Sequence, residues 1–200
     1  MVKTKIAVLV SGGGTNLQAL LDAQAAGILQ SGELALVVSN RADAHALTRA
    51  AEHGVEALFL EKEGFEAQLQ AALLARGIDL IVLAGFLRIL SADFTKAWPK
   101  RIINVHPALI PAFSGKGFYG LKVHEAALAC GVKLTGATVH FVNEIPDGGE
   151  IILQQAVPVL PGDSAETLQR RVMEEAEWTL LPEACEMVSQ QIAREKETER

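Results

Sequence analysis

The stretch Ile6-Ala7-Val8-Leu9-Val10-Ser11-Gly12-Gly13-Gly14-Thr15-Asn16-Leu17 decides the fold. Its first five residues are apolar and largely β-branched, which is typical of a buried strand. Glycines interrupt the run, and over residues 17–26 leucines recur at helical spacing. A strand that passes through a glycine loop into a helix is the repeating unit of an α/β fold.

The same alternation continues through the first half of the chain. Further strands are predicted at residues 34–39, 57–60, 80–84 and 102–105. Helices are predicted between them at residues 42–53, 65–75 and 90–98. The strand at 80–84 is apolar throughout, as expected where both faces of a parallel sheet are covered. We therefore predict an α/β, Rossmann-like, mostly parallel sheet with helices on both faces and right-handed crossovers.

The second half has a different pattern. Residues 107–120 are rich in Gly, Pro and aromatic side chains and are predicted to form a long surface loop, followed by a helix at 121–129. Strands at 133–142 and 151–159 are expected to pair around the turn 143–149 as an antiparallel C-terminal extension of the sheet. A last helix begins near Ser164, and the charged tail 193–200 is expected to be frayed and solvated.

Composition limits the possible classes of protein. Two hundred residues suit a single domain, and half of them are hydrophobic. The net charge of −6 argues against a nucleic-acid-coating protein. No apolar stretch approaches the ~18 residues of a membrane span, and no secretory signal is apparent, so we expect a cytoplasmic protein without membrane contact. The two cysteines and five histidines show no metal-binding spacing, so no metal is expected.

Polar side chains follow the strand at 102–105. Asn104 and His106 flank one residue and therefore point to the same side of a strand, and Asp147 lies in the turn Pro146-Asp147-Gly148-Gly149. An imidazole beside a carboxylate transfers protons near neutral pH, and an amide donor stabilises an oxyanion. The set suits acyl-type transfer without a covalent intermediate. A facing Asp147 would raise the pKa of His106. The structural alternatives are a packing histidine and an ordinary turn aspartate.

Two further segments lie at predicted strand ends. The glycine loop before Leu17 suits one phosphate, held by its N–H groups and the helix start, and it lacks the endings of a P-loop or a dinucleotide fingerprint. The alternative is a plain capped turn. Gly85-Phe86-Leu87-Arg88 favours a flat slot for a planar heterocycle, or else ordinary packing at a helix start. Strand ends in such sheets share one rim, where ligands bind. His140, on the strand at 133–142, is either a partner of these groups or a structural histidine.

Several motifs together resemble the folate-dependent phosphoribosylglycinamide (glycinamide ribonucleotide) formyltransferase family. The matching motifs, in order, are Val10 through Ala19, Val38-Ser39-Asn40, Leu83 through Leu90, Asn104 through Pro111, and His140-Phe141-Val142 with Asp147-Gly148-Gly149. The resemblance covers about residues 5–185. The Asn-x-His-Pro and Asp set marks a wider formyl-transfer family, and the Ser-Gly-x-Gly-Ser/Thr-Asn opening is the sharper marker.

The resemblance implies a role for each matched position. Asn104, His106 and Asp147 would be catalytic, and Gly14, Thr15 and Asn16 would hold the ribonucleotide phosphate. The co-substrate 10-formyltetrahydrofolate would be bound by Lys62, Leu87, Arg88, Ile89, Leu90 and Asn104. Residues 1–200 would form a single formyltransferase domain, with a phosphate-binding half at 1–106 and a folate and catalytic half at 107–200. The protein would act in purine biosynthesis as a monomer or homodimer.

The implied reaction is direct attack by the amine of glycinamide ribonucleotide on the formyl carbon. Asn104 and a protonated His106 would stabilise the oxyanion, and the proton would leave through His106 or a water held by Asp147. The chain departs from the family at three places. Lys62 stands where an arginine is usual, the loop at 115–121 is longer, and the run from Arg171 to Pro182 carries one extra residue. Glu177 or Glu175 would contact the ribose or the glycinamide.

Three rival functions remain. A 10-formyltetrahydrofolate hydrolase would use the same three residues with water as acceptor, but usually carries an extra N-terminal regulatory domain. An initiator-tRNA formyltransferase would usually have a further C-terminal domain and a more basic surface. A phosphate-binding regulator would keep the glycine loop without needing Asn104, His106 and Asp147.

Overall fold

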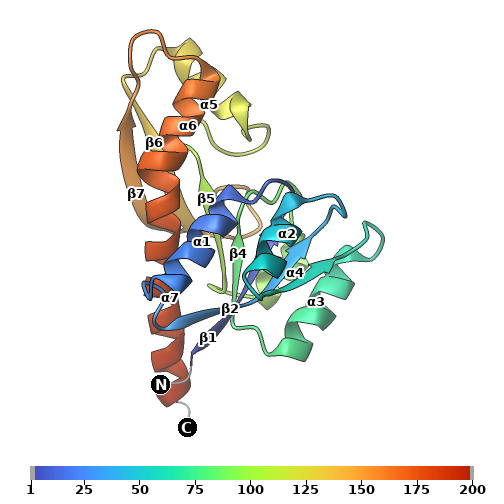
Figure 1. Cartoon of the computed structure of the whole chain (residues 1–200). Helices are drawn as coiled ribbons and strands as arrows, with labels where there is room; N and C mark the ends of the chain where they lie inside the picture. Colours follow the sequence, from blue (N-terminus) through green and yellow to red (C-terminus); the bar gives the residue numbers. More distant parts are fainter. Residues whose placement is uncertain (1–2, 199–200) are drawn as a thin grey trace.

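A computed structural model describes residues 3–198, and its core is one seven-stranded sheet (Figure 1). The strands are β1 (Thr4–Val10), β2 (Gly32–Ser39), β3 (Glu56–Phe59), β4 (Leu80–Leu83), β5 (Ile102–His106), β6 (Leu134–Phe141) and β7 (Ile151–Pro158). Their order across the sheet is β3-β2-β1-β4-β5-β6-β7. The first five are parallel, and β6 and β7 are antiparallel to their neighbours. The predicted fold class, including the antiparallel extension, is confirmed.

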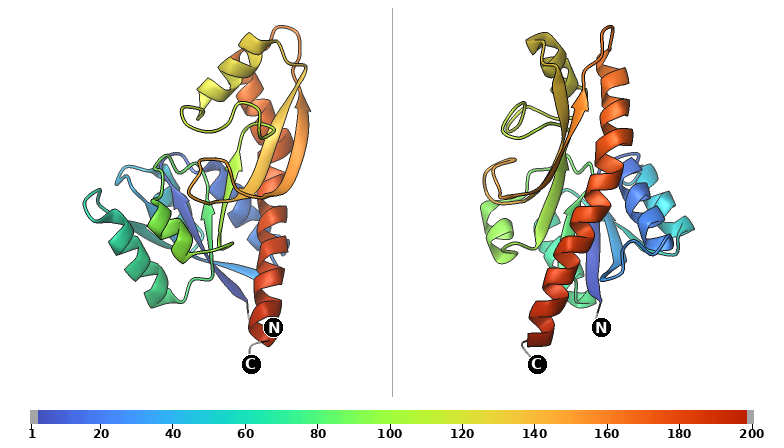
Figure 2. Two further views of the ribbon diagram at one scale, coloured as in Figure 1. Left: turned by 180° about the vertical axis from the view of Figure 1, so that it is seen from behind. Right: turned by 90° about the vertical axis from the view of Figure 1, so that its left-hand side faces the viewer.

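Helices cover both faces of the sheet. They are α1 (Thr15–Ala25), α2 (His45–Glu52), α3 (Phe65–Arg76), α4 (Ala92–Ala97), α5 (Leu121–Cys130), α6 (Ala165–Val172), the π-helix η1 (Met173–Glu177) and α7 (Trp178–Thr198). α3 and α4 pack on one face, while α1, α2 and α5 to α7 contribute to the core on the other. Figure 2 shows α7 running along the sheet on the face opposite α4.

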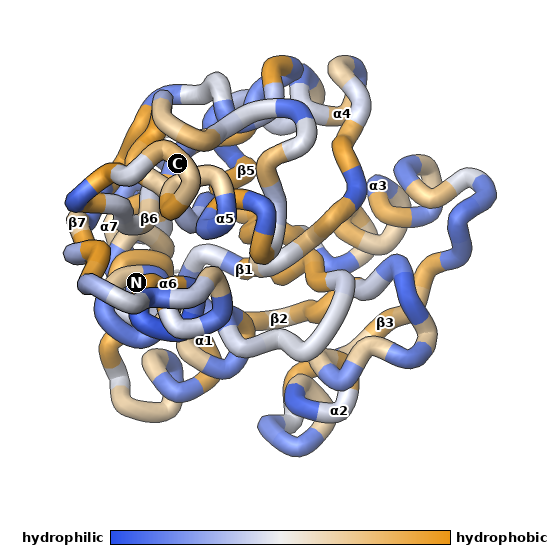
Figure 3. Tube along the Cα trace, turned by 90° about the horizontal axis from the view of Figure 1, so that it is seen from above, coloured by the Kyte–Doolittle hydropathy of each residue, from blue (hydrophilic) through white to orange (hydrophobic). Residues whose placement is uncertain are grey.

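The alternation of side chains along β1 explains why two cores form. Ile6, Val8 and Val10 point into the core beneath α1 and α7, whereas Ala7 and Leu9 point into the core beneath α3. All five are fully buried. Figure 3 shows the tube hydrophobic along β1 and β2, with hydrophilic residues gathered around the periphery. Burial of each large apolar side chain contributes about 1.5–3 kcal/mol, so this central strand anchors the domain.

The C-terminal tail differs from its prediction. Helix α7 continues to Thr198, and Ala193 is buried in the core. Glu195 pairs with Arg101 at 2.5 Å, and Lys196 pairs with Asp79 at 2.6 Å. The expected frayed tail is therefore wrong for residues 193–198, because ion pairs and an apolar face hold the helix against the sheet. Residues 199 and 200 lie outside the described part of the chain.

A five-residue π-helix separates α6 from α7. Each π turn contains one residue more than the corresponding stretch of α-helix, because its hydrogen bonds run from i to i+5. η1 lies within residues 171–182, the run for which the resemblance predicts one extra residue. A wide turn of this kind can absorb one residue while α6 and α7 on either side keep their buried faces toward the core.

Candidate active site

A large polar cleft lies at the carboxyl ends of the parallel strands. Its volume is about 780 Å³. The glycine loop, the segment after β4, the end of β5 and the turn before β7 all contribute to its walls. Sequence-predicted residues that line the cleft are Gly14, Thr15, Asn16, Leu87, Arg88, Ile89, Asn104, His106, Asp147 and Glu177. The structure therefore brings together most of the residues singled out from the sequence.

The glycine loop enters α1 through a left-handed residue. Gly14 has φ = +74°, and a Cβ atom there would lie 2.7 Å from the Cβ of Ala46. Only glycine fits this position, because both the backbone angle and the close approach exclude a side chain. Within residues 3–198 the N–H groups of Gly13, Gly14 and Thr15 have no hydrogen-bond partner. Unpaired N–H groups at a helix N-terminus suit an anion.

His106 and Asp147 meet although they lie on different elements. His106 is the last residue of β5 and is only 4% exposed. Its Nδ1 atom lies 3.6 Å from Asp147 Oδ2, and its Nε2 atom lies 2.8 Å from the carbonyl oxygen of Phe113. A carbonyl only accepts hydrogen bonds, so Nε2 carries the proton in the neutral ring. Nδ1, beside the carboxylate, is then free to take up a second proton.

Burial decides the resting charge of His106. Desolvation lowers the pKa of His106 below its usual value, and it outweighs the raising effects of Asp147 and of the Phe113 carbonyl. As expected, the facing Asp147 raises the pKa of His106, but burial lowers it by more, so the net shift is downward. Burial raises the pKa of Asp147, but the neighbouring His140 and His106 rings and the Gly115 N–H together bring it below the usual value. The resting pair is a neutral imidazole beside a carboxylate.

Asp147 is held in place by its turn. Its backbone is left-handed at φ = +56°, which Asp tolerates better than most residues, and its Oδ2 accepts a 2.8 Å hydrogen bond from the Gly115 N–H. A Cβ atom on Gly149 would lie 1.7 Å from the Phe141 carbonyl oxygen. Gly149 thus lets the turn close against β6, where Asp147 comes within reach of His106.

His140 contacts the other two polar groups. It is 1% exposed, and its Nδ1 atom lies 2.8 Å from the Phe141 carbonyl, which assigns the proton of the neutral ring to Nδ1. Its Nε2 atom then accepts from Asn104 Nδ2 at 3.2 Å and lies 3.5 Å from Asp147 Oδ1. This network turns the amide nitrogen of Asn104 toward His140, and within residues 3–198 the second N–H of that amide has no partner. His140 is thus a partner of the Asn104 side chain.

The segment after β4 forms the opposite wall. Leu87 and Ile89 are 65% and 67% exposed, and the Arg88 guanidinium lies 4.8 Å from the centre of the Phe65 ring. The Leu87 N–H donates to Ser11 Oγ at 2.9 Å, which ties this wall to the glycine loop. Leu90 is instead buried in the core beneath α3. Lys62 does not line the cleft, and its carbonyl accepts a hydrogen bond from Arg88 at 3.3 Å.

The structure distinguishes the two candidate glutamates. Glu175 is exposed, whereas Glu177 is 6% exposed and accepts a 2.6 Å hydrogen bond from Asn16 Nδ2. Burial raises the pKa of Glu177, and the Asn16 hydrogen bond opposes that shift. The π turn places Glu177 in the cleft beside Asn16 of the glycine loop.

Three contributors were missed by sequence reasoning. Gln169 and Met173 line the cleft from α6 and η1, and Phe113 reaches His106 through its backbone. Because the Phe113 contact is made by a backbone carbonyl, which every residue has, the residue type at position 113 could not predict it. The polar position of Gln169 near the end of an amphipathic helix was the available hint.

Within residues 3–198 no helix is both long and apolar enough to cross a membrane. Nor does this part of the chain contain a group of three or more His, Cys, Asp or Glu side chains placed to hold a metal ion.

Comparison with known proteins defines the class. The sequence profile of the formyl transferase family matches residues 4–185. The chain belongs to this family.

Individual proteins and solved structures of this kind are similar to the chain over most of its length. A chloroplastic phosphoribosylglycinamide formyltransferase of Arabidopsis thaliana is 40% identical over 86% of this chain, which spans 61% of that protein's length. The crystal structure of glycinamide ribonucleotide transformylase 1 from Symbiobacterium toebii is 45% identical, with a TM-score of 0.87 over 94% of this chain and 89% of that one. A formyltetrahydrofolate deformylase from Pseudomonas syringae is 27% identical, with a TM-score of 0.83 over 94% of this chain and 62% of that one.

Proposed function

We propose that this chain transfers the formyl group of 10-formyltetrahydrofolate to the amine of glycinamide ribonucleotide, a step of purine biosynthesis. One observation carries the proposal. A single cleft contains a cradle of free N–H groups and, on the same rim, Asn104, His106 and Asp147. A sugar phosphate held at the cradle would present its amine to these three groups. The names of the relatives at 40% and 45% identity support the choice of substrates.

The amine nitrogen attacks the formyl carbon, and the free N–H of Asn104 donates to the oxygen as it becomes negative. Donors prepositioned in this way typically supply about 10²–10³-fold in rate. A proton leaves the amine through a water held by Asp147 and reaches Nδ1 of His106. The imidazolium then lies between the Phe113 carbonyl and the Asp147 carboxylate, which both stabilise it. Transfer of that proton to N10 accompanies cleavage of the bond between N10 and the formyl carbon.

The other residues would bind the two substrates. Gly14, Thr15 and Asn16 hold the phosphate, and Glu177 accepts hydrogen bonds from the ribose or the glycinamide. Leu87, Arg88 and Ile89 form a wall for the pterin. Leu90 is buried, so its contribution would come from the backbone, and Lys62 would reach only the outer part of the folate. The division into halves at residue 106, a cytoplasmic location and a monomeric or homodimeric state stay predictions.

An assay with and without the amine substrate tests the function. The expected result is loss of 10-formyltetrahydrofolate that depends on glycinamide ribonucleotide and yields one formylated product per folate consumed. His106→Ala should reduce turnover by orders of magnitude while the circular dichroism spectrum stays that of the folded protein. Loss of the folate at the same rate without the amine would select the hydrolase instead. Near-normal turnover in His106→Ala would contradict the mechanism.

A further inference from the structure

The glycine loop is fixed from behind by helix α2. The carbonyl of Gly12 accepts from the Ala46 N–H at 3.1 Å, and the carbonyl of Gly13 accepts from Arg49 Nε at 2.8 Å. The carbonyl of Gly14 accepts from the Gln18 N–H at 2.9 Å as α1 begins. Three consecutive carbonyls of this loop are therefore engaged.

These contacts determine where the loop N–H groups point. A trans peptide is planar, so the N–H of each residue is directed opposite to the carbonyl of the residue before it. The Gly13 carbonyl bonded to Arg49 therefore directs the Gly14 N–H away from Arg49. Glycines on both sides would otherwise let this peptide plane rotate at little cost. Gly13 and Gly14 line the main cleft, whereas Arg49 does not.

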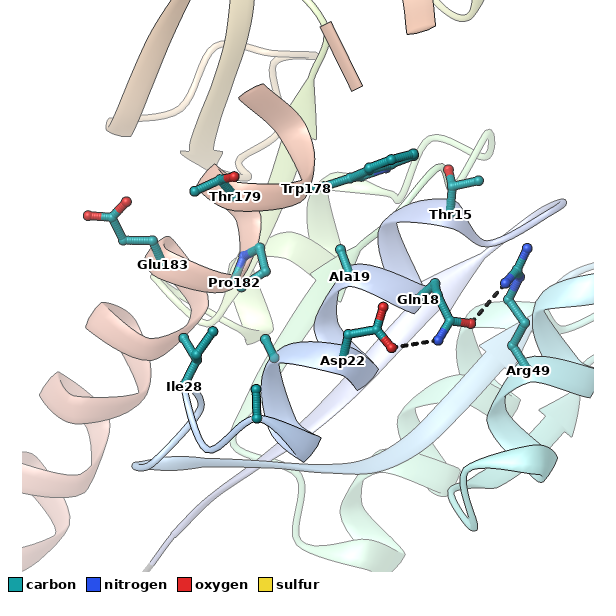
Figure 4. A pocket seen from close by; sticks show the side chains of 12 residues that line it. Thr15, Gln18, Ala19, Asp22, Ile28, Arg49, Trp178, Thr179, Pro182 and Glu183 are labelled. Carbon is teal, nitrogen blue, oxygen red and sulfur yellow. Dashed lines mark hydrogen bonds between the residues drawn. The ribbon is translucent and has the colours of Figure 1, made fainter. Parts of the chain in front are cut away.

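Arg49 itself is held by a second contact. Its Nη1 donates to Gln18 Oε1 at 2.8 Å, and Gln18 Nε2 donates to Asp22 Oδ1 at 2.8 Å. Figure 4 shows this row of side chains along one wall of a separate cavity of about 710 Å³, with Arg49 nearest the start of α1. The planar guanidinium reaches the loop carbonyl and the α1 side chain at once, which a lysine ammonium cannot do in the same fixed geometry.

We infer that Arg49 is a positioning residue for the phosphate cradle. It holds the peptide between Gly13 and Gly14 so that the Gly14 N–H points at the anion, and it places a positive charge behind the loop. The inference deepens the proposed function and rests on the phosphate being bound at this loop. If the inference is right, Arg49 strengthens the binding of substrates that carry the phosphate and has no effect on the binding of those that lack it.

Substrates with and without phosphate test the inference. In Arg49→Met, KM for glycinamide ribonucleotide should rise about tenfold, with kcat and the KM for the folate nearly unchanged. The KM for the dephosphorylated glycinamide ribonucleoside should stay the same in Arg49→Met and in the parent protein. Arg49→Lys should recover part of the loss, because it restores a charged donor to the Gly13 carbonyl. An equal rise in KM for both amine substrates would overturn the assignment.

A charge-matched control separates contact from net charge. Arg41→Met removes a cation just before α2, and within residues 3–198 Arg41 pairs only with exposed Asp43, at 2.8 Å, so the change should leave both KM values unchanged. Binding of inorganic phosphate, measured by titration calorimetry without turnover, tests Arg49 even if the proposed reaction fails. The affinity for inorganic phosphate should fall about tenfold in Arg49→Met and by a smaller factor in Arg49→Lys. The lysine variant carries the test if Arg49→Met does not fold. Unchanged phosphate affinity in the folded variants would refute the inference.

Discussion

At the scale of single residues, His106 balances two opposing effects. Its burial favours the neutral ring, and the Asp147 carboxylate 3.6 Å away favours the imidazolium. The neutral form is needed to accept a proton, so kcat/KM should be full above the pKa of His106 and decline as the pH falls through it. That pKa is lowered from the ordinary 6.5, which places the acid limb of the profile below 6.5.

Asp147→Asn should move this acid limb to lower pH. The substitution removes the carboxylate that raises the pKa of His106, whereas burial, which lowers it, remains. The acid limb of the residual kcat/KM is therefore expected at lower pH in the variant than in the parent protein. Asp43→Asn, at an exposed aspartate, is the control and should leave the limb in place. Movement of the limb to higher pH in Asp147→Asn would contradict this account.

The sequence predicted which polar residues would lie close together, but not their protonation states or hydrogen-bond partners. Asn104 and His106 share a face because strand side chains alternate, and Asp147 comes close because the turn before β7 folds back. The charge of His106 depends on how fully neighbouring elements exclude water, which no local pattern contains. The Phe113 carbonyl, the amide orientation of Asn104 and the contact of Arg49 with Gly13 are likewise products of tertiary packing.

At the scale of elements, the π turn η1 determines which glutamate enters the cleft. A surplus residue that sits in a wide turn can be removed without rotating the helices on either side. Deletion of exposed Glu174 should therefore convert η1 to a regular α turn, keep Glu177 next to Asn16 and cost about 1 kcal/mol or less. Thermal unfolding followed by circular dichroism measures the loss.

Deletion of exposed Gln190 in the regular part of α7 is the matched control. It removes one residue where no wide turn can absorb the change, so the following turn rotates by about 100°. Ile192 and Ala193 would leave the core, and we expect several kcal/mol of destabilisation. Equal losses in the two deletions would show that η1 is not a tolerated insertion.

Hydrophobic periodicity predicted which segments are helices and strands, but it predicted the ends of the helices less accurately. The predicted helix over residues 42–53 is observed only at His45–Glu52, and that over 90–98 only at Ala92–Ala97, where Ser91 Oγ accepts from the Phe94 N–H. Capping contacts of this kind fix the ends of helices, and several residue types can make them. The resemblance predicts one extra residue between Arg171 and Pro182, but it did not predict the π turn found there.

At the scale of the whole molecule, the sheet order follows from the alternation of strands and helices, and the cleft follows from the sheet order. Parallel strands place their carboxyl ends on one rim, which is why three separate motifs meet there. The tail was mispredicted because its charges suggested solvent, while their partners Arg101 and Asp79 are almost a hundred residues or more away along the chain. Long-range ion pairs of this kind cannot be read from local composition.

The buried His124 links global stability to pH. It lies in the first turn of α5 with no exposed surface, and within residues 3–198 neither ring nitrogen has a hydrogen-bond partner. Burial, with a smaller contribution from His106, lowers the pKa of His124 from 6.5 to about 4. Between these values the unfolded chain binds a proton that the folded chain does not. Stability from this group is therefore complete above 6.5 and falls as the pH drops, by roughly 3 kcal/mol in all.

His124→Leu should remove that pH dependence. Leucine has a similar volume and binds no proton, and because the imidazole makes no hydrogen bond in the described chain, the substitution should cost little near neutral pH. Urea unfolding across the range from about pH 7 to pH 4 gives the free energy of unfolding of both proteins. As the pH falls, the free energy of unfolding of the variant should increase relative to that of the parent. Only the parent has a buried imidazole that must stay neutral while the proton concentration rises. Parallel curves over this range would show that His124 already has a proton-accepting partner in the fold, and the burial argument for its pKa would fail.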